Sequence, residues 1–142
     1  MISFDDFKKI EICAGKILAV EKVPNADKLL KLTVDFNEKT EVVAAIAPSV
    51  DIELSPDTQP VKTIIPKFRQ IISGISAFFP DPQVLVGKTS MFVTNLEPRI
   101  IRGLESQGMI LAISTPPTES NPLGNFSLLE PNQSIPPGTC AK

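Results

Sequence analysis

The 142-residue chain contains no histidine, tryptophan or tyrosine. Without histidine it cannot build a Ser-His-Asp triad, a Cys-His pair or a histidine-based metal site. Its two cysteines, Cys13 and Cys140, are too few for a four-cysteine metal site. Nothing in the sequence motivates a disulfide between two residues so far apart, so we expect isolated thiols in a reducing cytoplasm.

Long apolar runs are also missing. The opening stretch MISFDDFKKIEI carries acids where a signal peptide has its apolar run, and no run is long enough to span a bilayer. We therefore expect a soluble cytoplasmic protein with no membrane partner. The formal net charge is −2 and the sequence pI is about 5.2, which counts against nucleic-acid binding unless the basic residues gather on one face.

Short strands dominate the sequence pattern. Fourteen prolines against seven glycines indicate many short segments instead of long helices. Ser3 can cap a short helix that ends near Lys9. Gly15 suggests a bulge or bend within the first strand, and residues 37–39 read as a turn. Apolar or alternating runs predict strands at residues 10–23, 30–36, 41–47, 61–65, 68–75, 90–94, 109–113 and 126–129.

This order of elements predicts an all-β fold. A helical turn at residues 83–86, stopped by Gly87, lies between the third and fourth strands of the expected sheet. Strands in this order, with an N-terminal helix in front, are typical of an OB-fold, a five-stranded barrel. The length suits a single domain covering residues 1–142.

OB-folds bind ligands through the face of strands 2 and 3 and through the loops between strands 1–2 and 4–5. These loops contain PNADKLLKL and NLEPRIIRGLESQGM. They offer cations for phosphates, polar groups for phosphate or base edges, and a methionine that can pack under a base. The candidate contact residues are Asn25, Lys28, Arg99, Arg102, Ser106 and Met109.

Simpler interpretations compete with this one. Arg99 and Arg102 have acidic neighbours and could belong to a solvated mixed-charge loop, and Met109 could be a core residue. Phe78 and Phe79 could stack on bases, but anchoring the helical turn in the barrel is favoured. The carboxylate pairs 5/6 and 97/105 have no nucleophile or pocket beside them, so we expect no enzyme, no catalytic residue and no cofactor.

Four stretches resemble one known family: FDDFKKIEICAGKILAVEKVPNADKLLKLTVDF, RQIISGI, PDPQVLVGK and NLEPRIIRGLESQGMILA. The ending SLLEPNQSIPPGT is similar to the tail of the same family. The family is the OB-fold tRNA-binding domain. It occurs as a free-standing dimeric tRNA-binding protein, at the C-terminus of methionyl-tRNA synthetases, in the β chain of bacterial phenylalanyl-tRNA synthetase and, in a close relative, as the CsaA secretion chaperone.

The resemblance implies non-catalytic binding of tRNA, mainly through its shape and backbone. By position, the family's contacts fall on Lys28 with Asn25 beside it, on Arg99 and Arg102, and on the pair Ser106 and Met109. The implied partners are tRNA, a second copy of the chain and an aminoacyl-tRNA synthetase. The alternative implied function is a CsaA-like chaperone that binds unfolded polypeptide.

Three departures from the family pattern bear on function. Cys13 and Ile100 stand where the family often has cations, so two charges are lost from the expected tRNA surface. Residues 40–67 replace the family's tight turn between strands 2 and 3. We expect them to form a β-arm that prolongs both strands, with residues 56–60 at its tip and a composition suited to a protein contact.

Overall fold

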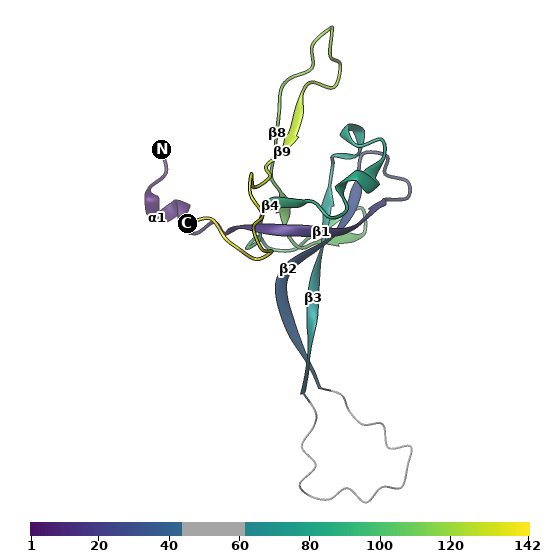
Figure 1. Ribbon diagram of the computed structural model, residues 1–142. Coiled ribbons are helices and arrows are strands. Elements are labelled where there is room, and N and C mark those ends of the chain that lie inside the picture. The colour runs from purple at the N-terminus through teal and green to yellow at the C-terminus, as the bar shows by residue number, and fades with distance from the viewer. Residues whose placement is uncertain (44–61) are drawn as a thin grey trace, which may run out of the picture.

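The computed structural model describes residues 1–43 and 62–142 (Figure 1). Its centre is a curled, five-stranded antiparallel half-barrel with the strand order β3-β2-β1-β4-β7. The mostly-β architecture expected from the sequence is confirmed in this form. The strands of the half-barrel are β1 (Ile12–Lys22), β2 (Leu30–Val43), β3 (Lys62–Ser73), β4 (Thr89–Val93) and β7 (Met109–Ile110). Two hairpins complete the set of strands: β5 (Arg99–Ile101) with β6 (Leu104–Ser106), and β8 (Ala112–Ser114) with β9 (Phe126–Leu128).

The helical elements are short, as expected: α1 (Phe4–Phe7), η1 (Ser76–Phe78) and η2 (Pro82–Leu85). The Asp6 backbone N–H donates to the Ser3 hydroxyl at 3.1 Å, and the Ser3 N–H donates to the Asp6 carboxylate at 3.2 Å. This capping box confirms the predicted start of α1. No helix in the described residues is long and apolar enough to cross a membrane.

The core lies inside the curl of the half-barrel. In β2, residues Leu30, Leu32 and Val34 are fully buried, which confirms the alternation seen in the sequence. Phe36 continues this row and meets the Phe92 ring edge-on, with the ring centroids 5.3 Å apart. Large, fully buried side chains of β1, β3 and η2 complete the same cluster: Ile17, Ile71 and Leu85.

Phe78 and Phe79 pack inward on the helical connection, as favoured above. Phe78 stacks on the Phe126 ring at 4.2 Å between centroids, and Phe79 meets that ring edge-on at 5.7 Å. The two phenylalanines thereby attach η1 to β9. Both rings are half-buried and engaged with Phe126, which favours the anchoring role over a stacking platform for bases.

Gly15 permits a close approach of two strands. A Cβ atom at this position would lie 2.6 Å from side-chain atoms of both Phe36 and Val34. The irregularity in the β1–β2 ladder falls further along, between Ile17 and Ala19. The predicted bulge at Gly15 is therefore displaced, and the glycine is required because a core phenylalanine occupies the space above it.

The predicted turn at residues 37–39 is wrong. β2 continues to Val43, and the irregularity there is a shift in its ladder with β3 between Asp35 and Glu38. Asn37 takes the left-handed backbone conformation, with φ of 57°, which a turn and a bulge share. Because the ladder resumes beyond the bulge and runs to the pair Val43–Lys62, β2 and β3 form an arm projecting from the half-barrel (Figure 1). Its expected tip, residues 56–60, lies outside the described residues.

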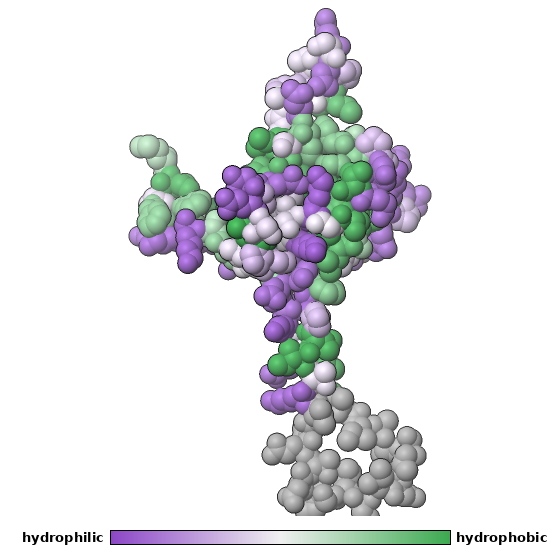
Figure 2. Space-filling model, viewed as in Figure 1, coloured by the Kyte–Doolittle hydropathy of each residue, from purple (hydrophilic) through white to green (hydrophobic). Residues whose placement is uncertain are grey.

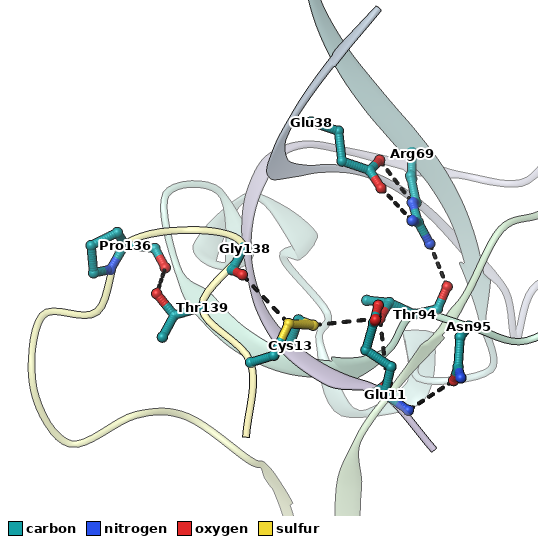
Figure 3. The surroundings of a disulfide bond; sticks show 10 residues. Glu11, Cys13, Glu38, Arg69, Thr94, Asn95, Pro136, Gly138 and Thr139 are labelled. Carbon is teal, nitrogen blue, oxygen red and sulfur yellow. Dashed lines mark hydrogen bonds and ion pairs between the residues drawn. A yellow bond between two sulfur atoms is a disulfide. The ribbon is translucent and has the colours of Figure 1, made fainter. Parts of the chain in front are cut away.

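The C-terminal tail folds back along β1. The Ala14 N–H donates to the Thr139 carbonyl at 2.8 Å, and the Ala141 N–H donates to the Ile12 carbonyl at 2.7 Å. This pairing sets Cys13 directly opposite Cys140, and the two form a disulfide (Figure 3). The expectation of isolated thiols is wrong, because the tail pairing brings together two residues 127 positions apart.

Candidate nucleic-acid interface

The turn between β1 and β2 carries two of the predicted site residues. The Ala26 N–H donates to the Val23 carbonyl at 3.2 Å, and the Leu29 N–H donates to the Ala26 carbonyl at 3.0 Å. Asn25 has a φ of 58°, a left-handed conformation that asparagine tolerates well. These two bonds make the turn compact, and they leave the side chains of Asn25 and Lys28 exposed.

The hairpin of β5 and β6 carries the predicted arginines. Its two central residues, Arg102 and Gly103, have φ values of 51° and 80° and follow the pair Ile101–Leu104. Two successive left-handed residues in a two-residue loop are typical of a type I′ turn. Arg102 therefore stands exposed at the tip, and Arg99 stands exposed at the base opposite Ser106.

The tip of this hairpin faces the β1–β2 turn. Asn25, Lys28 and Arg102 line one pocket of about 400 Å³, together with Ala26, Asp27, Leu29 and Ile101. Three of the six residues predicted from sequence thus share one concave site. We call it the tip pocket.

The remaining three lie on the other side of the hairpin. Arg99, Ser106 and Met109 line a smaller pocket of about 150 Å³ with Ile72, Leu96, Glu97, Ile101 and Gly108. We call it the base pocket. Ile101 lines both, so the hairpin forms the wall between them.

Ser106 differs from the other five residues because it is buried, with 5 % of its surface exposed. Its hydroxyl accepts from the Ile72 N–H at 3.0 Å and donates to the Gly108 carbonyl at 3.1 Å. Both bonds lie inside the protein, so the hydroxyl joins the end of the hairpin to β3. Met109 is 47 % exposed, which excludes the alternative that it is a core residue.

In the part of the chain that the structure describes, carboxylates do not engage the cations of this surface. Within the described residues, no acid lies within 4.0 Å of the charged groups of Lys28, Arg99 or Arg102. Glu105, expected as a possible partner, instead accepts from the Gln107 side chain at 2.9 Å. Asp27 and Glu97 do line the two pockets, so the surface is mixed in charge while its cations remain available.

Arg69 positions the loop that carries the hairpin, and the sequence did not single it out. Its guanidinium donates to the Glu38 carboxylate through two nitrogens, one of them at 2.9 Å, and its third nitrogen donates to the Thr94 carbonyl at 2.5 Å (Figure 3). The third nitrogen also donates to the Gln107 carbonyl at 3.3 Å. It also lies over the Phe36 ring at 5.3 Å. The arginine thereby fixes both ends of the loop that carries the hairpin. A charged residue within the strand-like stretch FRQIISGI is the sequence feature that could have indicated it.

The ion pair changes the titration of both partners. Hydrogen bonding from Arg69 lowers the pKa of Glu38, against the opposing effect of its partial burial. The same bond raises the pKa of Arg69. The pair therefore remains charged throughout the neutral range and holds its geometry there.

A second set of bonds joins β3 to the loop. The Gln107 N–H donates to the Gln70 carbonyl at 2.8 Å, and the Gln107 side-chain oxygen accepts from the Gln70 N–H at 3.2 Å. The Gln70 side chain in turn donates to the Glu105 carbonyl at 2.8 Å. These glutamines bridge the open side of the half-barrel, where β3 and the segment before β7 approach each other.

One cluster in the described residues has the composition of a metal site. The ligand atoms of Glu11, Cys13 and Cys140 lie within 4.8 Å of one another. The two sulfurs are bonded to each other, so neither is available as a thiolate ligand. The Glu11 carboxylate is occupied by a hydrogen bond from the Thr94 hydroxyl.

Comparison with known proteins identifies relatives of this chain. The family model described as "Putative tRNA binding domain" matches residues 60–140, which is more than half of the chain. A methionine–tRNA ligase from Methanoregula boonei is 40 % identical over 139 residues, covering 98 % of this chain. The match covers 15 % of the ligase, so the chain spans only a small part of the curated relatives it resembles.

Solved structures share the fold. A MetRS-related protein from Pyrococcus horikoshii superposes with a TM-score of 0.68 at 29 % identity, over 100 % of this chain and 98 % of that one. The chaperone CsaA from Bacillus anthracis superposes with a TM-score of 0.64 at 22 % identity, over 100 % and 99 % of the two chains. With the family model and the ligase relative, these structures confirm the resemblance stated from the sequence. The chain therefore belongs to the tRNA-binding domain family.

Proposed function

We propose that the chain binds tRNA without catalysing a reaction, and that the tip and base pockets together form the binding surface. The observation that carries this proposal is the convergence of Asn25, Lys28 and Arg102, from two separate loops, on the tip pocket. A lysine and an arginine that no carboxylate of the described residues engages are suited to phosphate oxygens. Arg99 and Met109, at the base pocket, extend the same surface.

The chemistry of this surface favours recognition of backbone and shape. Its cations serve phosphates, whereas few exposed groups are suited to reading base edges. In this proposal Ser106 positions the hairpin and does not itself contact tRNA, because both hydrogen bonds of its hydroxyl are made inside the protein. Ile100, where the family often has a cation, is 70 % exposed on β5, so the surface is weakly charged and its affinity for tRNA should depend strongly on salt.

Filter binding of bulk tRNA across a range of salt concentrations tests the proposal. Three phosphate-neutralising cations predict that log affinity falls with log salt at a slope of about −2 to −3. Lys28→Ala should weaken binding to all tRNAs and reduce that slope by about one unit. Lys62→Ala removes a cation that pairs with Glu41 on the arm and serves as the matched control. Absence of tRNA binding at low salt would overturn the proposal.

We also propose that residues 1–142 act as one cytoplasmic OB-fold module, free-standing or associated with an aminoacyl-tRNA synthetase. The glutamine bridge between β3 and the hairpin loop supports closure of the half-barrel into that fold. Similarity to a small part of a methionine–tRNA ligase supports a binding role beside a catalytic unit. A pull-down of a co-expressed synthetase by this chain tests the association.

A CsaA-like chaperone is the second candidate, and one observation favours it. Apolar side chains on the arm are exposed, among them Ile64 at 62 %, Val43 at 57 % and Phe68 at 45 %. Figure 2 shows this hydrophobic surface along the arm, below the half-barrel. Suppression of aggregation of an unfolded polypeptide, lost in Ile64→Ser, would support this function. Retention of that suppression in Lys28→Ala would separate it from tRNA binding.

A homodimer fits either function. The apolar residues of the N-terminal segment are largely exposed: Ile2 and Phe4 are 70 % exposed, and Phe7 and Ile10 are 45 % exposed. α1 lies to one side of the half-barrel, next to the C-terminus (Figure 1). We propose that a second copy covers this segment, which would also present two tRNA surfaces to one large ligand.

A further inference from the structure

We propose that Cys13 and Cys140 form a reversible modification site for small thiols of the glutathione class. In this exchange, Cys140 is the sulfur that is attacked, and Cys13 is the sulfur that leaves and later resolves the adduct. The proposal does not depend on tRNA binding, because it concerns the end of the tail and not the two pockets.

The backbone holds the two cysteines together with or without the sulfur–sulfur bond. Hydrogen bonds join Ala14 to Thr139 and Ile12 to Ala141, on either side of the cysteine pair, and the Gly138 N–H donates to the Ala14 carbonyl at 2.8 Å. A pair flanked in this way is a non-hydrogen-bonded pair, in which side chains approach most closely. Reduction therefore leaves both sulfurs adjacent, so that the bond can form again.

The two sulfurs differ in access. Cys13 is only 3 % exposed and lies within the core cluster, whereas Cys140 is an exposed residue on the tail. A thiolate must reach the sulfur that it attacks, and access is one of the factors that set the rate of exchange. The exposed side of the bond therefore directs the incoming thiolate to Cys140.

Access decides which sulfur leaves. The single proton of the Thr94 hydroxyl is donated to the Glu11 carboxylate, and the Thr94 oxygen lies 3.5 Å from the Cys13 sulfur (Figure 3). An attack on the exposed Cys140 sulfur breaks its bond to Cys13, so the buried Cys13 sulfur is the one that departs. Once displaced, the Cys13 thiolate remains beside Cys140 and can attack it again.

The exchange balances in two steps. A small thiolate attacks the Cys140 sulfur and forms a mixed disulfide, while the bond to Cys13 breaks and the Cys13 thiolate takes a proton from water. A second small thiolate attacks the sulfur of the small thiol in the mixed disulfide and releases Cys140 as a thiolate. Two electrons pass from two small thiols, which become their disulfide, to the cysteine pair. The reverse sequence, started by the oxidised small thiol, restores the protein disulfide.

Mass spectrometry of the full chain with glutathione tests the proposal. In Cys13→Ser, oxidised glutathione should form a lasting adduct on Cys140, because the resolving sulfur is missing. In Cys140→Ser, the adduct on Cys13 should form at least tenfold more slowly. The wild-type chain should pass between a disulfide form and a two-thiol form and accumulate little adduct.

Two results would overturn the proposal. One is a wild-type chain that keeps two alkylatable thiols after treatment with oxidised glutathione. The other is a Cys13 that reacts as fast as Cys140.

If the serine variants fail to fold, peptide mapping of wild-type protein quenched in acid early in the reduction replaces them, and the adduct should lie on Cys140. Circular dichroism should show native structure in both redox forms, with a lower midpoint of thermal unfolding after reduction.

Discussion

Arg102 occupies a backbone position that suits few residues. Its φ of 51° puts it in the left-handed region, at the first position of the type I′ turn, where asparagine followed by glycine is the preferred pair. An arginine at this position costs stability relative to asparagine and places a cation at the tip of the hairpin. The same residue therefore opposes stability and serves the proposed function.

One substitution can separate the effect of Arg102 on stability from its effect on tRNA binding. Arg102→Asn keeps the conformation of the turn and removes only the cation, so the variant should unfold at the same temperature as the wild type or slightly above it. Its affinity for tRNA at low salt should fall about three- to tenfold, as expected for one lost phosphate contact. Binding and thermal unfolding, measured on the same samples, check both expectations. Unchanged affinity would remove Arg102 from the site.

The ion pair of Arg69 and Glu38 predicts a pH dependence of stability. Because the folded-state pKa of Glu38 is lowered, its contribution is complete above the ordinary glutamate pKa and is lost as the pH falls through the lowered value. Glu38→Gln should therefore unfold about 1 to 3 kcal/mol more easily than the wild type at neutral pH. Urea unfolding across pH checks this, and the gap between the two proteins should close in acid. A constant gap would contradict it.

At the scale of single residues, the sequence could predict positions that depend on their immediate neighbours, whereas it could not predict contacts between residues far apart in the chain. Asn25 and Lys28 lie in a turn whose conformation is determined by consecutive residues of the sequence. The burial of Ser106 depends on its bond to Ile72, 34 positions earlier in the chain, and the role of Arg69 depends on Glu38 across two strands. Nothing in the neighbourhood of either residue in the sequence indicates these partners.

At the scale of elements, β2 shows how one residue pattern serves two structures. Asn37 and its neighbours carry a turn composition, and the alternation of Leu30, Leu32 and Val34 ends just before them. A hairpin there would have ended the strand, whereas a bulge bends the strand and lets pairing with β3 continue to Val43. The partner strand lies beyond residue 61 of the chain, and this long-range pairing decides between the two outcomes.

The approach of β1 to Phe36 predicts the effect of a single methyl group. In Gly15→Ala, the new Cβ would overlap side-chain atoms of Phe36 and Val34, which have no room to move in the core. Such overpacking should cost about 1 to 3 kcal/mol of stability. Gly74→Ala is the control, because the nearest atom to its added Cβ would be 4.0 Å away. Chemical unfolding of both variants checks the difference, and equal losses would contradict it.

The whole molecule extends from its half-barrel in three directions. The β2–β3 arm, the β8–β9 hairpin and α1 each leave the core, and α1 buries none of its residues (Figure 1). The composition predicted the mostly-β core well, because alternation along a strand reports burial directly. It predicted these extensions less completely, because exposed apolar residues on them, such as Ile64, do not follow the burial pattern of the core.

Light scattering checks the proposed homodimer. The wild-type chain should have about twice the 15.4 kDa mass of one copy, with dissociation on dilution. Phe4→Ser combined with Phe7→Ser should shift the equilibrium toward the monomer, because the proposed contact loses most of its apolar area. Leu123→Ser, which alters an exposed residue on the β8–β9 connection, should leave the mass unchanged. A monomeric wild type at high concentration would rule out the dimer.

The bond between Cys13 and Cys140 makes the backbone from residue 13 to residue 140 a covalent ring. Opening one peptide bond anywhere within that ring leaves one molecule, because the two pieces remain joined through the sulfurs. The exposed, proline-rich connection from residue 115 to residue 125 is a surface at which a protease could make such a cut. A chain nicked there would separate into two fragments only after reduction, so tolerance of proteolysis would follow the redox state of its surroundings.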